Sequence, residues 1–234
     1  MKDGLLLVDK EPGLTSHDVV QKVRRLLKQK KIGHCGTLDP DATGLLLLTL
    51  GTATRLTRFL IRAPKVYEGV VQLGSATDTY DASGQVTSQA PPEAVAALTH
   101  EAVAEGMKRF EGTIEQKPPA YSAKKIQGVK YYELARKGEE VPDESKEITV
   151  YEFSPIGELG PDGRFRFRLA CSSGTYARGL AHDLGAALGV GGHLAELRRT
   201  KIGGFQVEEA ATFRGLEELT ESGEPAESTW IPFD

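Results

Sequence analysis

The amino-acid sequence predicts a protein of mixed helices and strands, and three patterns carry this prediction. Short apolar runs at residues 4–9 and 45–51 have the length of buried strands and are bounded by turn-forming residues. The segment Arg164–Leu169 alternates arginine with apolar residues, which is typical of a strand with one buried face. After Ser16, which we expect to cap a helix, apolar residues recur at helical spacing.

The other elements follow in order along the chain, without internal repeats or a long linker. We expect helices near residues 54–61, 99–109, 129–137 and 175–188, and strands near residues 66–73 and 195–203. Residues 1–207 form the predicted body, and residues 208–234 a short acidic C-terminal tail. The formal net charge of the chain is −4, but without the tail 28 basic residues stand against 25 acidic ones. The body is therefore mildly positive.

The composition points to an ordinary globular protein, with 39% hydrophobic and 26% charged residues. No stretch reaches the ~18 apolar residues that a membrane-spanning helix needs. Cys35 and Cys171 are the only cysteines, too few for a disulfide framework. We therefore expect a cytoplasmic protein that makes no membrane contact.

Two clusters of basic residues are candidates for contact with a nucleic-acid backbone. Six of the ten residues from Lys22 to Lys31 are basic and none is acidic. Localised positive patches attract polyanions, although a solvated helix face is the alternative for this cluster. The arginines of Arg164–Leu169 could form a third basic surface. The residues expected to bind the RNA backbone are Lys22, Arg24, Arg25, Lys28, Lys30 and Lys31 in the first cluster and Lys124, Lys125 and Lys130 in the second.

The polar loop at residues 36–44 is the strongest candidate for a reactive site. It lies between two glycines directly before the apolar run of residues 45–50. Asp39 precedes a proline, which disfavours helical backbone at Asp39. We expect its carboxylate at the end of a core strand, where a nucleophile or general base could be positioned. The alternative is an aspartate that only stabilises the turn through its own backbone.

Arg178 is the second unusual residue, because the sequence places it in the first turn of a helix. A cation there opposes the helix dipole, at a cost of about 0.3–1 kcal/mol. The position makes better sense if the guanidinium faces an anion such as a carboxylate or phosphate; a solvated arginine is the alternative. The sequence has no phosphate-binding glycine motif, no nucleophile elbow and no zinc-ligand spacing.

Six short segments, in order from about residue 4 to residue 205, resemble motifs of the TruB family of tRNA pseudouridine synthases. Residues 34–40, His-Cys-Gly-Thr-Leu-Asp-Pro, are similar to the family's catalytic motif. Residues 65–68 are similar to the strand that carries its active-site tyrosine. The other similar segments are residues 10–16, 117–125 with Gly128 and Tyr131, 173–178 and 197–200. Each motif alone is weak, but six in order at similar separations are specific.

The resemblance implies an α+β fold with a mixed, mostly antiparallel central sheet flanked by helices and an RNA-binding cleft across the sheet. It implies isomerisation of uridine to pseudouridine at position 55 in the T loop of tRNA, without cofactor or metal. Asp39 would be the nucleophile, Arg178 its partner, and Tyr67 a contact to the target base. The other matched residues are His34, Tyr176 and Leu197, expected to contact the RNA or the flipped base, and Lys10 and Pro12, expected to support the catalytic loop.

The chemistry requires an ionised Asp39 inside a pocket that excludes water, with Arg178 offsetting the cost of burial. The carboxylate could attack the ribose, attack the base, or assist departure of the base through a glycal, and the sequence leaves these routes open. Tyr67 could also accept the C5 proton.

The short acidic tail leaves no room for a complete C-terminal RNA-binding domain of the PUA type. We therefore expect recognition of the T stem-loop by a monomer that needs no guide RNA. Two other functions are compatible with parts of the pattern: a non-catalytic module that binds or folds tRNA, and a glycoside hydrolase with Asp41 as its second acid.

Overall fold

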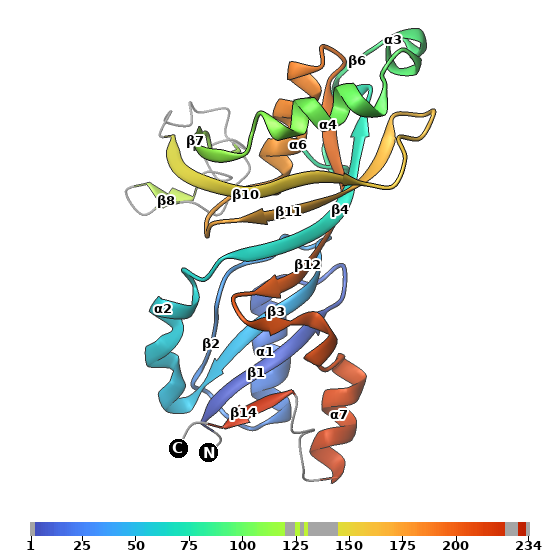
Figure 1. The fold of residues 1–234 in the computed structure, drawn as a ribbon. Coiled ribbons are helices and arrows are strands. Elements are labelled where there is room, and N and C mark those ends of the chain that lie inside the picture. Colours follow the sequence, from blue (N-terminus) through green and yellow to red (C-terminus); the bar gives the residue numbers. More distant parts are fainter. Residues whose placement is uncertain (1–2, 120–124, 127–128, 131–144, 223–228, 233–234) are drawn as a thin grey trace. The chain divides into compact units, whose positions relative to one another are not determined.

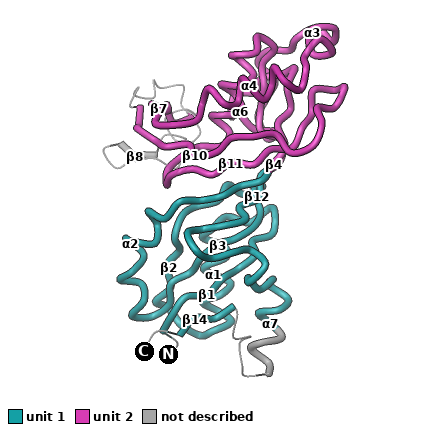
Figure 2. Tube along the Cα trace, viewed as in Figure 1, with its two compact units in different colours: residues 1–68, 197–234 teal, residues 69–196 magenta. Residues whose placement is uncertain are grey.

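The computed structural model describes residues 3–119, 125–126, 129–130, 145–222 and 229–232 (Figure 1). The chain forms two compact units (Figure 2). Unit 1 comprises residues 1–68 and 197–234, and unit 2 comprises residues 69–196. The chain passes between the units within two long strands, β4 (Lys65–Leu73) and β12 (Gly192–Ile202).

Unit 1 contains a mixed sheet whose hydrogen-bonded order is β14-β1-β3-β12-β4. Outside this order, β2 pairs with β3 and β13 pairs with β12. The β12–β3 pair is parallel. The pairs β1–β14, β1–β3, β2–β3 and β12–β13 are antiparallel. The register of β1 on β3 runs from Gly4 opposite Leu50 to Lys10 opposite Gly44, so Lys10 lies beside the end of the Asp39 loop. The elements are β1 (Gly4–Lys10), α1 (Ser16–Leu26), β2 (Ile32–His34), β3 (Thr43–Leu50), the 3-10 helix η1 (Gly51–Leu56), α2 (Thr57–Leu60), β13 (Phe205–Gln206), the 3-10 helix η2 (Val207–Glu209), α7 (Phe213–Ser222) and β14 (Trp230–Pro232).

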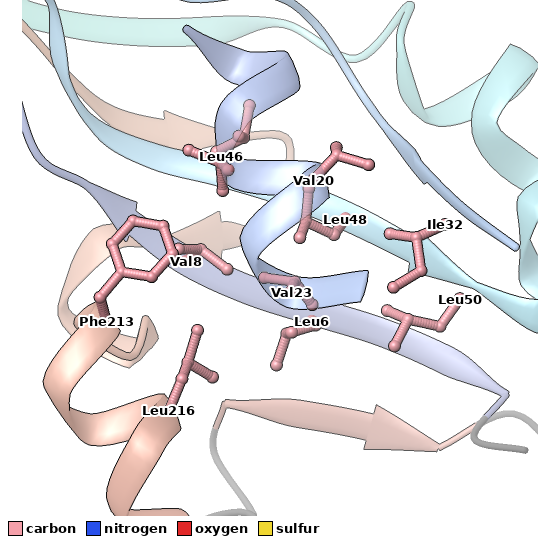
Figure 3. Close-up of a cluster of buried hydrophobic side chains, with 11 residues drawn as sticks. Leu6, Val8, Val20, Val23, Ile32, Leu46, Leu48, Leu50, Phe213 and Leu216 are labelled. Carbon is pink, nitrogen blue, oxygen red and sulfur yellow. The ribbon is translucent and has the colours of Figure 1, made fainter. Parts of the chain in front are cut away.

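The leucine run of β3 supplies both faces of the unit 1 core. Leu46, Leu48 and Leu50 pack with α1 and α7 on one face (Figure 3), and Leu45 and Leu47 pack on the other. All five side chains are fully buried, which contributes about 1.5–3 kcal/mol each. This two-sided burial explains why the strand is a continuous apolar run and not an alternating one. It also gives the adjacent Asp39 loop a rigid base.

The expectation that Ser16 caps α1 is wrong by one residue. Thr15 is the N-cap: its hydroxyl accepts a hydrogen bond from the Asp18 backbone, and the Asp18 side chain accepts one from the Thr15 backbone. This reciprocal capping box satisfies two backbone donors that the helix start would otherwise leave without partners. Ser16 is the first helical residue and is buried, and its hydroxyl bonds to Leu38 in the loop that carries Asp39.

Unit 2 contains the sheet order β4-β11-β10-β7, and the pairs β10–β11 and β10–β7 are antiparallel. Helix α4 packs on β10, and Val103 and Met107 are its most buried side chains. The elements are β5 (Ser75–Thr77), β6 (Val86–Gln89), α3 (Pro92–Ala96), α4 (His100–Lys108), β7 (Gly112–Gln116), β8 (Lys125–Ile126), β9 (Val129–Lys130), β10 (Lys146–Ile156), β11 (Arg164–Cys171) and α6 (Ala177–Ala187).

Strand β11 confirms the predicted alternation, because Phe165, Phe167 and Leu169 are buried and the arginines between them point the other way. The arginines of β11 do not form the third basic surface that the sequence suggested, because acidic residues lie beside them. Arg164 forms an ion pair with Glu196, and Arg168 forms one with Glu152 at 3.2 Å, so two of the three arginines are neutralised by neighbours on the sheet.

The predicted α+β class, with its mixed and mostly antiparallel sheet, is confirmed. The helix expected near residues 129–137 is not found at its start, where Val129–Lys130 pairs with Lys125–Ile126 as a hairpin, and residues 131–137 lie outside the described residues. The division expected at residue 207 stays a prediction. In the described part of the chain, no helix has the length and hydropathy of a membrane span.

Candidate active site

The Asp39 loop connects β2 and β3 in unit 1. The Ala42 amide donates to the Asp39 carbonyl at 3.1 Å, and the Gly13 amide donates to the Pro40 carbonyl at 3.0 Å. These bonds form a tight turn and tie it to the loop after β1. The Asp39 side chain is exposed. The expected pocket that excludes water around Asp39 stays a prediction.

Lys10 connects two loops from beneath the surface. Its side chain is fully buried, and its ammonium donates to the carbonyls of Glu11 at 2.9 Å, Leu14 at 2.7 Å and Pro40 at 2.8 Å. These three bonds use all the donors of the ammonium. Burial lowers the pKa of Lys10, while the Asp41 and Asp39 charges act in the opposite direction. Pro12, on the loop that Lys10 holds, is exposed.

The sequence did not indicate two other contacts to this loop. The Ser16 hydroxyl accepts from the Leu38 amide at 2.9 Å and donates to the Leu38 carbonyl at 3.3 Å. The Arg199 guanidinium, 1% exposed, donates to main-chain carbonyls on both sides of Asp39. A serine at a helix start and an arginine in a basic pair are common on surfaces, so neither residue type signals a buried role.

The other predicted residues of unit 1 lie on the strands next to the loop. His34 ends β2 and is half-buried, and burial lowers its pKa, with the positive charge of Arg199 acting in the same direction. Tyr67 is 9% exposed on β4. Leu197 lies on β12, and its carbonyl accepts from the Thr43 hydroxyl at 3.5 Å. Strands β12 and β4 are neighbours, so Tyr67 and Leu197 lie on adjacent strands.

In unit 2, Arg178 lies in the first turn of α6 and is 6% exposed. Its Nη1 donates to Asp81 Oδ2 at 3.1 Å and to the Thr79 carbonyl at 3.4 Å. The prediction that this guanidinium faces an anion is confirmed, and the anion in unit 2 is a carboxylate. Tyr176, the N-cap, is held by Gln116, whose side chain bonds to the Tyr176 amide at 2.8 Å and carbonyl at 2.9 Å.

Asp81, which the sequence did not indicate, organises the loop between β5 and β6. Burial would raise its pKa, but hydrogen bonds from Ser83 and Thr79 and the Arg178 charge together lower the pKa below its ordinary value. The preceding residue, Tyr80, has φ of 66°, which is rare for an aromatic residue. Its ring stacks on His182 at 3.8 Å between centroids, which attaches the loop to α6 one turn beyond Arg178.

The predicted catalytic residues fall into both units: Asp39 and Tyr67 belong to unit 1 and Arg178 to unit 2. The pairing of Asp39 with Arg178 therefore stays a prediction. Within unit 1 the structure joins Lys10 to the Asp39 loop directly. The segments that the structure describes hold no group of three or more histidine, cysteine, aspartate or glutamate residues arranged to bind a metal ion.

The predicted RNA-contacting basic residues differ in how far they are engaged in the fold. The Lys22 ammonium lies 4.6 Å from the centre of the Phe213 ring, and Arg24 donates to the Ile32 carbonyl at 3.0 Å. Lys125 and Lys130 are opposite each other in the β8–β9 hairpin, while Lys124 lies outside the described residues. The remaining first-cluster residues are all exposed: Arg25, Lys28, Lys30 and Lys31.

Comparison with known proteins identifies the family. Residues 24–177 match the model of the TruB family pseudouridylate synthase N-terminal domain, which is more than half of the chain. The chain belongs to the TruB family. Residues 178–229 of this TruB-family protein match the model of the tRNA pseudouridylate synthase B C-terminal domain. The resemblance seen in the sequence is thus confirmed, and the protein is an enzyme, a pseudouridine synthase.

Bacterial relatives and solved structures agree with this assignment. The chain is 49% identical to tRNA pseudouridine synthase B of Leifsonia xyli, over 92% of this chain and 72% of that protein. It is 47% identical to the protein of that name from Thermobifida fusca, over 99% of this chain and 78% of that protein.

The fold is similar to the structure of a Cbf5-Nop10-Gar1 complex, with a TM-score of 0.73 and 31% identity over 99% of this chain. It is also similar to an H/ACA RNP bound to a substrate RNA containing 2′-deoxyuridine, with a TM-score of 0.72 and 29% identity over 98% of this chain. The chain spans about 60% of the length of those solved chains.

Proposed function

We propose that this TruB-family enzyme isomerises the uridine at position 55 in the T loop of tRNA, with Asp39 as nucleophile and Arg178 as its partner. The observation that carries the proposal is the Asp39 loop. Lys10, Ser16 and Arg199 bond to its main chain from within the fold, while the Asp39 carboxylate remains exposed to an incoming substrate. A loop fixed so firmly around one exposed acid is preorganised to present that acid to a substrate.

The reaction converts an N-glycoside into a C-glycoside. The C1′–N1 bond of uridine breaks, the base rotates, and C5 bonds to C1′ while the C5 proton leaves and N1 gains a proton. Asp39 serves this sequence by attacking the ribose, attacking the base, or assisting glycal formation. Each route needs the ionised carboxylate, and each detaches the base for a short time.

In the proposed complex the RNA contributes to a dry environment around Asp39. A flipped uridine covers the exposed carboxylate, and the resulting loss of water raises the free energy of its charged form. Arg178 offsets this cost because a guanidinium stays charged at any working pH. Tyr67 and Leu197, on neighbouring strands, hold the detached uracil by contact with its faces, and Tyr67 accepts the C5 proton.

Docking of the RNA rests on groups at the surface. His34 and Tyr176 contact the RNA beside the flipped base, and the exposed residues Arg25, Lys28 and Lys30 contact phosphates of the stem. The bacterial relatives are named as tRNA enzymes, which supports tRNA as the substrate. We extend the proposal to a monomer that works in the cytoplasm without a guide RNA, unlike the H/ACA complexes among the structural neighbours.

The test is incubation of the purified chain with an unmodified T stem-loop and with whole tRNA, followed by mapping of any isomerised uridine. We expect isomerisation at position 55 at similar rates in both RNAs. Asp39→Asn should lower the rate at saturating RNA by at least about 1,000-fold with tRNA affinity retained. Asp41→Asn, a change of the same kind two residues away, is the control and should keep most of the activity. Activity that survives in Asp39→Asn would contradict the proposal.

A further inference from the structure

We propose that Arg199 is a positioning residue for this reaction: a buried cation that clamps the Asp39 loop by its carbonyls and keeps a positive charge beside the loop. The inference rests on the proposed function in one respect, namely that Asp39 is the nucleophile. The residue acts through the loop and does not itself touch the RNA. Its side chain is 1% exposed.

The clamp spans both ends of the loop. Arg199 Nε donates to the Leu45 carbonyl at 2.8 Å, after Asp39, while Nη2 donates to the Gly36 carbonyl at 3.1 Å and Nη1 to the Thr37 carbonyl at 3.4 Å, before it. A planar guanidinium can make these three bonds from one fixed position, which the flexible lysine side chain does less well. The path of the chain on each side of Asp39 is therefore set by one side chain.

The backbone around Arg199 is built for this close approach. Arg199 pairs with Gly44 across the parallel ladder of β12 and β3. A Cβ atom at Gly44 would lie 2.3 Å from the Arg199 carbonyl oxygen, and its φ of 98° also favours glycine. The glycine at the end of the Asp39 loop thus admits the strand that carries the clamp.

The hydrogen-bond partners of Arg199 also determine how much of its positive charge is balanced. All three described partners are carbonyls, as are the three described partners of Lys10. A carboxylate partner would cancel part of the field of a cation, whereas carbonyl dipoles leave its net charge in place. Burying an ion is costly, and an apolar side chain of similar volume is often the more stable choice. The retained charge therefore points to a role in catalysis beyond folding.

The charged groups around this site are few enough to name. Lys10 on β1 and Lys65 on β4 are buried cations, and Asp39, Asp41, His34 and Cys35 are the titratable groups of the loop and its flank. Burial lowers the pKa of Lys10 and His34 and raises that of Cys35, and the positive charge of Arg199 acts downward on all three. Its field thus reaches both flanks of the loop.

The charge matters most when RNA arrives. Phosphates bring negative potential to the loop, and a buried cation beside the loop offsets part of it. Removal of that cation should therefore shift the acid limb of the rate at saturating RNA to higher pH.

Three variants separate the clamp from the charge. Arg199→Met removes both, Arg199→Lys removes the planar clamp and keeps the charge, and Ser16→Ala removes a loop bond of Leu38 without any change in charge. The rate at saturating T stem-loop and the RNA affinity are measured from about pH 5 to about pH 9. Circular dichroism and thermal unfolding establish which variants are folded.

We expect Arg199→Met to lose roughly 100-fold in rate and to shift the acid limb upward by about half a pH unit or more. Arg199→Lys and Ser16→Ala should each lose about tenfold with the acid limb unchanged. RNA affinity should stay within about threefold in all three, because none of these side chains reaches the RNA. If Arg199→Met does not fold, Arg199→Gln replaces it as the uncharged variant.

Two results would overturn the inference. An acid limb like that of wild type in the uncharged variant would contradict the electrostatic role of Arg199. A rate like that of wild type in Arg199→Lys would contradict the role of its planar clamp. The second test does not depend on the uncharged variant, because the lysine variant keeps the buried charge. Wild-type enzyme and Asp39→Asn, assayed beside them, separate this inference from the proposed function. If wild type fails to isomerise the T loop, the proposed function is wrong; if it succeeds and the Arg199 variants match it, only the inference fails.

Discussion

The two units use buried cations in opposite ways. In unit 1, the side chains of Lys10 and Arg199 donate hydrogen bonds to main-chain carbonyls around the Asp39 loop. In unit 2, Arg178 Nη1 donates to Asp81 Oδ2 at 3.1 Å, and the Thr79 carbonyl is its second described partner in that unit. Both arrangements give a buried charge hydrogen-bond partners, but the first supports a carboxylate on a loop and the second orients a guanidinium.

A cation bound to carbonyls fixes backbone and keeps its charge, which suits a loop that presents an acid. A cation bound to a carboxylate has part of its charge balanced and gains a fixed plane and direction. We infer that unit 1 supplies a rigid, electrostatically supported carboxylate, and that unit 2 supplies a guanidinium oriented before the RNA binds.

Arg178→Lys should have the largest effect. An ammonium keeps the charge but loses the planar geometry that Asp81 and Thr79 orient, so the rate at saturating RNA should fall on the order of several hundred-fold while tRNA affinity stays. Single-turnover kinetics measure both quantities. Arg198→Lys is the matched control, since Arg198 binds Asp9 through two bonds of 3.0 Å and 2.7 Å outside the loop contacts, and we expect a change below about threefold. Equal losses in both variants would remove the special role of Arg178.

Lys10→Met tests the unit 1 arrangement through stability. Its loss leaves the carbonyls of Glu11 and Leu14 without their described donor and removes one of the two described donors of the Pro40 carbonyl, so the free energy of unfolding should fall by about 2 kcal/mol. Urea unfolding measures the change. Lys30→Met removes an exposed lysine and should stay within about 0.5 kcal/mol of wild type. A Lys10 variant as stable as the Lys30 variant would show that the carbonyl contacts contribute little.

The sequence predicted the elements of this site better than its contacts. The leucine run of β3 and the alternation of β11 are local patterns, and both strands form as expected. The position of Asp39 at the end of a core strand also followed from local signals, a proline and two glycines. Its exposure did not, because burial depends on groups that approach from elsewhere, including the RNA.

Long-range partners explain the residues that were missed. Asp81 and Arg178 are 97 positions apart, and Arg199 reaches a carbonyl 154 positions away. No periodicity or spacing relates such residues in a single sequence. The cap of α1 was misplaced for a related reason. Serine is by residue type a slightly better cap than threonine, but the hydroxyl of Ser16 bonds to Leu38 and Thr15 takes the cap position.

Replacement of the exposed basic residues gives a comparison for the buried ones, because it should weaken RNA binding without a change in the rate of bound RNA. Replacement of Arg25, Lys28 and Lys30 together by glutamine should weaken T stem-loop binding about tenfold and flatten its dependence on salt. The rate of bound RNA should stay nearly normal. Arg164→Gln with Arg168→Gln is the matched control, because glutamates already neutralise both arginines. A variant of the first set that binds normally but reacts slowly would contradict this division of roles.

The smallest effect should be a pH dependence of stability that belongs to unit 2. The folded protein holds the pKa of Asp81 below its ordinary value of 3.8, so the folded state binds fewer protons there than the unfolded state. The stabilisation is present above that ordinary value and is lost as the pH falls through the lower, folded value. Unfolding of wild type and Asp81→Asn is compared at about pH 5 and about pH 2.5. Wild type should lose more stability between these conditions than the variant, which has no carboxylate to protonate. Identical losses would mean that Asp81 gains neither from its hydrogen bonds with Ser83 and Thr79 nor from its contact with Arg178, and the contrast between the two units would then reduce to one of geometry.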